Sequence, residues 1–233
     1  MLEIITIQEE VEEKENFFAD YVKSYGFLFI IMAITVSATY PSTDTTAGEK
    51  ERGTLETLLT FPIKAKDIIL GKFLGVSISS VITGVISLVL AMVALAIAQN
   101  MFAIYEGINI MYEPMTIVVA IAIIFAYSFF VSGLCIAIAS TSKTFKEAQS
   151  ALTPLTFISF FPGMIAFMTD IASSPLLSMV PFLNYTMLFT DIIKGKVDYL
   201  NISLMLLSTV VYITIVLKLI IKQYKSENIL FSK

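Results

Sequence analysis

Five long apolar runs dominate the sequence and decide what kind of fold the chain can adopt. They cover residues 24–40, 73–98, 115–140, 151–169 and 200–221. A helix needs about 20 mainly apolar residues to cross a bilayer, and only the first run falls short. Hydrophobic residues make up 57% of the chain and charged residues only 15%, well below the share in soluble domains. We therefore predict an all-α polytopic membrane protein with about five transmembrane helices.

The first and fourth runs have features of their own. The first reaches spanning length if Lys23 extends its amine to the membrane surface and Tyr21, Tyr25 and Tyr40 lie in the interfaces. The fourth contains Pro154 and the pair at 162–163, which predict a kinked or broken helix with free carbonyl groups. If an ion site exists in the spans, those carbonyls are where we would expect it.

Composition also excludes several classes of function. A net charge of -4 and a pI near 4.9 give no basic surface for nucleic acid. One cysteine and no histidine leave no disulfide framework and no cysteine-rich metal site. An intramembrane protease would need ionisable residues near the middle of its spans, and these spans carry none. No G-x-x-x-x-G-K-[ST] pattern occurs, so we expect any ATP hydrolysis to belong to a separate subunit, and we predict no catalytic residue, metal or cofactor.

Positive charge is distributed unevenly among the connecting segments. Eleven of the 15 lysine and arginine residues fall between the first and second runs, between the third and fourth, or near the carboxyl end. Short cytoplasmic loops retain positive charge. We therefore expect the N-terminus outside, with an acidic extracellular flank at 1–22, a transmembrane domain at 23–221 and a cytosolic tail at 222–233.

The segment between the first two runs is the most informative part of the chain. Two glycines bracket a charged cluster, after which Thr54 is a good N-cap for a short helix that ends at Phe61-Pro62. Leu55, Leu58 and Leu59 fall on one face of that helix, and Asp67 is placed to cap the next one. Two interpretations stay open: an interfacial helix resting on lipid, or an element that docks a cytosolic partner.

The run AGEKERGTLETLLTFPIKAKDIILGK, residues 47–72, resembles the signature of ABC-2 type permeases, and within them most the sodium-extrusion permeases. The similarity continues more weakly in the stretches at 181–185 and 224–231. It implies a cell-membrane permease subunit of an ATP-binding-cassette exporter, paired with a separate ATPase subunit and a second permease, with sodium as the cargo. Exporters of drugs, peptides or lipids remain alternatives. The residues that the resemblance assigns to coupling with the ATPase are Gly48, Glu49, Lys50, Glu51, Arg52, Gly53, Thr54, Leu55 and Leu58.

The chain departs from the pattern of that family in one respect. The family has six membrane helices and a large extracellular domain after the first, whereas the acidic flank here looks like the end of such a domain. Residues 1–233 thus resemble the C-terminal half to two-thirds of a full permease. We expect a split gene, a misplaced start, or a truncated relative that serves as a non-transporting membrane scaffold.

Small and polar residues suggest where the helices pack and where a pathway could run. In the second run a four-residue set of small side chains shares one helical face, which favours close helix packing. An alternative is that hydroxyl groups there line a polar pathway. The packing set is Ser80, Gly84, Ser87 and Ala91, and the pathway set is Ser77, Ser80, Thr83 and Ser87. The segment at 170–199 reads as a short helical hairpin or re-entrant cap.

Overall fold

The structure of the chain is a computed structural model. It describes residues 2–101, 110–169, 171 and 173–225, and the side chains of residues 18–55, 57–58, 61–101, 110–169, 171 and 173–224. The described residues are almost entirely helical and contain no strand. The predicted fold class, an all-α polytopic membrane protein, is confirmed.

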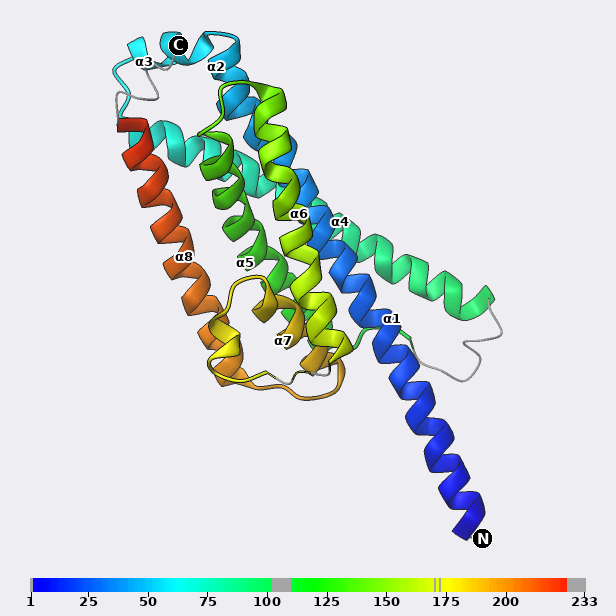
Figure 1. Cartoon of the computed structure of the whole chain (residues 1–233). Coiled ribbons are helices and arrows are strands. Elements are labelled where there is room, and N and C mark those ends of the chain that lie inside the picture. Colours follow the sequence, from blue (N-terminus) through cyan, green and yellow to red (C-terminus); the bar gives the residue numbers. More distant parts are fainter. Residues whose placement is uncertain (1, 102–109, 170, 172, 226–233) are drawn as a thin grey trace.

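Five helices are long and apolar enough to cross a membrane, counted over the described part of the chain. Each matches one of the predicted runs, two of which end one residue beyond the helix (Figure 1). Their bounds are α1 Leu2–Thr43, α4 Ala65–Met101, α5 Pro114–Ala139, α6 Phe145–Met168 and α8 Tyr199–Lys225. Helices α1 and α4 extend well beyond their apolar runs. Asp67 therefore lies inside the first turn of α4, and its prediction as a cap was wrong because α4 begins two residues earlier.

Helix α5 occupies the centre of the bundle, while α4 lies at its margin. Helix α5 packs against α1, α4, α6, α8 and the short helix α7, and it is the most buried of the five spans. Few residues of the α4 span are buried, and α1 and α5 are its main neighbours. The predicted close packing holds at Gly84, where an added Cβ would lie 2.6 Å from Ile124 and 2.8 Å from Ile34.

Helix α6 continues through both of its prolines. The structure assigns one helix over Phe145–Met168 with Pro154 and Pro162 inside it, so the predicted break does not occur. A proline removes one backbone donor but leaves the flanking hydrogen bonds, and neighbouring helices can support the helix at that point. Such support is close at Gly163, where an added Cβ would lie 2.5 Å from Leu28 and 2.6 Å from Thr186.

Between α6 and α8 the chain folds back into the bundle, as the re-entrant prediction required. A 3₁₀ turn, η3 Leu177–Met179, leads to α7 Leu183–Ile193. The first turn of α7 is deep, because Tyr185 is fully buried and its ring lies 5.1 Å from that of Tyr127, near the middle of α5. Phe189 stacks on Phe27 of α1 at a ring distance of 3.6 Å. Phe182 enters this helix with a φ of +68°, a conformation that bulky residues rarely adopt.

Candidate functional site

The segment that connects α1 to α4 forms three short helical pieces at one end of the bundle, near the end of α8 (Figure 1). They are the π-helical turn η1 Asp44–Gly48, then α2 Glu49–Glu51, then α3 Thr54–Thr60. All nine residues predicted to couple to an ATPase lie here, from the last residue of η1 to the middle of α3. The structure has a short helix at Thr54–Thr60 that ends before Phe61-Pro62, as predicted, while its role in coupling stays a prediction.

We refer to Glu49, Lys50, Glu51 and Arg52 as the charged cluster, since each of these side chains bonds to a different structural element. Glu49 Oε2 accepts a hydrogen bond from Lys72 Nζ of α4 at 2.5 Å. The same Nζ donates to the carbonyl of Thr45 at 2.5 Å and lies 5.8 Å from the centre of the Tyr224 ring of α8. The Lys72 side chain is only 8% exposed, so this ion pair is largely withdrawn from water.

Lys50 and Glu51 bind the adjoining ends of two further helices. Lys50 Nζ donates to the carbonyls of Ser140 and Ser142, just beyond the carboxyl end of α5. Glu51 Oε2 accepts from the N–H of Phe145, the first residue of α6, at 2.6 Å. Carbonyls at the end of a helix and N–H groups at its start lack partners within the helix, and the helix dipole favours a cation at the first and an anion at the second. The positive charge of Lys50 thus lies at the carboxyl end of α5, and the negative charge of Glu51 lies at the amino end of α6.

Arg52 connects the charged cluster to Asp44, the first residue of η1. Its guanidinium donates to Asp44 Oδ1 at 2.9 Å and to the Asp44 carbonyl at 3.2 Å. An added Cβ at Gly48 would lie 3.3 Å from both groups, so only glycine leaves this contact undisturbed. Both side chains are about half exposed, and such a surface pair stabilises weakly.

The turn into α3 differs from the prediction at Thr54. Gly53 takes a left-handed φ of +70° and stands at the N-cap position, a conformation that glycine adopts without strain. Thr54 therefore begins the helix, and its hydroxyl donates to the Glu49 carbonyl at 3.2 Å. Its prediction as N-cap was wrong by one residue.

The predicted leucine face is partly turned inward. Leu55 is 4% exposed and belongs to the hydrophobic core, and Leu58 is half-buried. The side chain of Leu59 lies outside the described residues. Instead, Phe61 and Ile63, just after α3, are 55% and 51% exposed. Among the described side chains of this segment they form an exposed apolar surface, and the prediction did not include them because they follow the helix.

Sequence reasoning also missed the acceptors and donors that hold the charged cluster. The partners that it did not identify are Lys72, Ser140, Ser142 and Phe145. Ser140 extends the connection to α8, because its hydroxyl donates to Gln223 Oε1 at 2.8 Å. Lys72 stands at the start of an apolar span, and a charge in that position indicates that an acidic partner is nearby. Backbone donors and acceptors cannot be identified from the sequence, because almost every residue has them.

The polar positions predicted within α4 divide into two groups. Ser77 and Ser80 are fully buried, and Thr83 and Ser87 are partly buried. Ser132 of α5 donates to the Ser80 hydroxyl at 3.3 Å. Whether these residues line a pathway stays a prediction. The described residues hold no group of three metal-binding side chains.

Comparison with known proteins decides the family. The family model described as "ABC-2 family transporter protein" matches residues 2–218. The chain belongs to this family. Among curated proteins, this ABC-2 chain is similar to "ABC transporter permease protein NatB" of Bacillus subtilis (strain 168), with 28% identity over 201 residues. That alignment covers 85% of this chain and 52% of the relative, so the chain spans about half the length of the curated protein it matches. No solved structure matches this chain.

Proposed function

We propose that the chain is the membrane permease subunit of an ATP-binding-cassette exporter, with a separate ATPase subunit docking on the segment that contains α2 and α3. The charged cluster carries this proposal, because it joins the docking segment to α4, α5, α6 and η1 through four different bonds. Membership of the ABC-2 family and the resemblance of residues 47–72 to permease signatures support it.

The bonds of the charged cluster suggest how a docked ATPase would act on the bundle. A force on α3 passes through Gly53 to α2, and from there to the ends of three membrane helices. Displacement of the docking segment would therefore shift α4, α5 and α6 together and open a path towards the opposite side. The distribution of lysines supports a cytoplasmic position for this end of the bundle, with the N-terminus outside. Pairing with a second permease would let two ATPases act at once.

The docking surface that the structure favours is the exposed pair Phe61 and Ile63, next to the cluster. Interfaces gain most of their free energy from apolar anchors surrounded by polar groups, and Lys64 and Lys66 are exposed beside this pair. In this proposal, residues Gly48 to Leu58 position the docking surface and transmit its displacement to the membrane helices, while Phe61 and Ile63 contact the ATPase.

Co-purification tests this division of roles. The chain is co-expressed with an ATP-binding-cassette ATPase from the same gene neighbourhood, and ATPase recovery and transport are measured. We expect the double variant Phe61→Ser with Ile63→Ser to lose the ATPase, and the control Lys146→Ser, at an exposed position of α6, to keep it. Glu51→Gln should keep the ATPase but lose transport. Association retained by the double variant would favour the alternative in which α3 rests on lipid.

We propose sodium as the cargo on the resemblance to sodium-extrusion permeases alone. A sodium ion prefers oxygen ligands, and with no ionisable residue near the middle of a span these would be hydroxyl or carbonyl groups. Export of drugs, peptides or lipids is the alternative. Sodium efflux from proteoliposomes, followed with a sodium-sensitive dye inside them, distinguishes the two. Efflux that requires ATP and the ATPase supports sodium, and its absence beside export of another compound contradicts it.

A further inference from the structure

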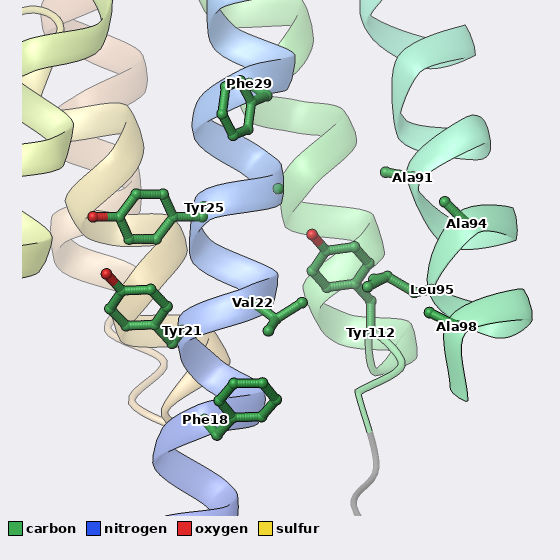
Figure 2. Close-up of a pocket in the computed structure, with 11 residues that line it drawn as sticks. Phe18, Tyr21, Val22, Tyr25, Phe29, Ala91, Ala94, Leu95, Ala98 and Tyr112 are labelled. Carbon is green, nitrogen blue, oxygen red and sulfur yellow. The ribbon is translucent and has the colours of Figure 1, made fainter. Parts of the chain in front are cut away.

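An apolar groove lies between α1 and α4, at the opposite end of the helix pair from the charged cluster. It encloses about 560 Å³. Aromatic and aliphatic side chains of α1 form one wall, and small side chains of α4 form the other, with Tyr112 at one edge. Figure 2 shows Val22 and Tyr112 between the two helices, with Ala94 and Ala98 facing them from α4. Among the described residues that line it, none carries a charge.

The two walls of the groove differ in length. The wall on α1 runs from Phe18 to Phe29, and the wall on α4 runs antiparallel from Ala98 to Ala91. Eleven residue steps of 1.5 Å make about 17 Å along α1, and seven steps make about 10 Å along α4. Half of the hydrocarbon thickness is about 15 Å. The α1 wall is therefore about as long as one leaflet is thick, and α4 covers about two thirds of that length.

The volume of the groove selects a thin occupant. One turn of a helix, about 10 to 12 Å wide and 5.4 Å high, fills about 400 to 600 Å³. The groove would hold a single turn and could not seat a membrane helix along its length. A cavity of this size is typical of small-ligand sites. With apolar walls in a membrane protein, the chemistry that fits is a hydrocarbon chain.

The wall on α1 is held in place before any ligand arrives. On the side of α1 that points away from α4 (Figure 2), the rings of Tyr21 and Tyr25 stack at 4.6 Å, and both pack edge-on against Phe167 of α6, which holds α1 in place. Tyr112 donates its hydroxyl to the carbonyl of Lys23 at 2.8 Å, and burial raises the pKa of its phenol, so its polar group is satisfied within the protein. A preformed wall lowers the entropy cost of binding.

We propose that this groove binds one acyl chain of a membrane phospholipid, with its headgroup at the level of Phe18 and Ala98 and its chain end at the level of Phe29 and Ala91. The adjoining face of α4 is exposed at Leu90, Val93 and Ile97. Lipid that surrounds this face can therefore enter the groove directly from the bilayer. The proposal is independent of the exporter function.

Photolabelling tests it. The chain is reconstituted in nanodiscs whose phospholipid includes a fraction with a diazirine in the acyl chain, and labelled peptides are quantified by mass spectrometry. We expect stronger labelling of residues 18–29 and 91–98 than of the outward face of α8 around Leu207, which is 63% exposed. Equal labelling of the two regions would overturn the proposal, because α8 reports ordinary contact with bulk lipid.

Variants that fill the groove with a larger side chain give a second test. Ala94→Trp fills it from α4 and Val22→Trp fills it from α1, while Leu207→Trp adds the same ring on the outward face of α8. Both filled variants should lose groove labelling down to the α8 level, and Leu207→Trp should keep it. Groove labelling retained by both folded variants would overturn the proposal. So would a disulfide between two copies of Ala94→Cys in the absence of lipid label, because a second copy would then occupy the groove.

Discussion

The two ends of helix α4 contact the preceding part of the chain by different kinds of interaction. At one end, Lys72 of α4 binds Glu49 and the Thr45 carbonyl through directed polar bonds. At the other end, α1 and α4 face each other across the apolar groove. Hydrogen-bonded charges keep one geometry because leaving them unpaired is costly, whereas apolar contacts can be exchanged for lipid. The polar end is thus suited to transmit a displacement, and the apolar end to accommodate one.

Removing Lys72 tests the polar end with the largest expected effect. Lys72→Met leaves Glu49 and the Thr45 carbonyl without their donor, and breaking a buried ion pair costs about 3 kcal/mol. Thermal unfolding in detergent should show a clear loss, and a double-mutant cycle with Glu49→Gln should show strong coupling. Lys66→Met, at an exposed position of the same helix, serves as control. An equal effect of the two variants would show that the pair contributes no special stability.

A bulkier residue at Gly84 tests the contact between the two ends. The Cβ of Gly84→Val would lie within 3 Å of Ile124 and Ile34, and overpacking of this kind costs about 2 kcal/mol. We expect α4 to move away from α1, with lower thermal stability. Ile34→Ala in the same chain should restore part of the loss. Gly75→Val is the matched control, because no atom lies within 4 Å of an added Cβ there. Destabilisation by the control alone would contradict this packing.

The surface pair of the charged cluster should matter least. Arg52→Gln removes the ion pair with Asp44, whose partners are 53% and 41% exposed, and such pairs contribute less than about 1 kcal/mol. The loss should shrink further in high salt, since exposed charges are screened. Unfolding at low and high salt, with Lys64→Gln as control, measures it. A loss as large as that of Lys72→Met would mean that Arg52, rather than Lys72, anchors the segment.

Much of the fold was predictable because membrane insertion imposes long apolar runs. Each of the five runs matches one described helix, and the signals at Gly53 and Phe61-Pro62 located α3 within a residue. The errors came from neighbouring structure. Gly53 takes the cap position predicted for Thr54, and close packing at Gly163 accompanies an unbroken α6.

The candidate site was predictable only in part. The charged cluster stood out as a local pattern, but its partners lie far away in sequence: Lys72 is 23 residues from Glu49, and Ser140 is 90 residues from Lys50. Three of its partners are backbone groups at helix ends, which any residue can supply: the carbonyls of Ser140 and Ser142 and the N–H of Phe145. The groove is likewise a product of how α1 and α4 diverge, and alanines on an apolar helix do not predict it.

The depth of α7 has a consequence for how the protein is made. Its 11 residues reach only about 17 Å, too short to cross the bilayer as an independent span. Its buried face contacts α1, α5, α6 and α8, and the last of these is synthesised after it. The contact between α7 and α8 therefore forms only after α8 has been synthesised, whereas the contacts of α7 with α1, α5 and α6 join segments that are already made.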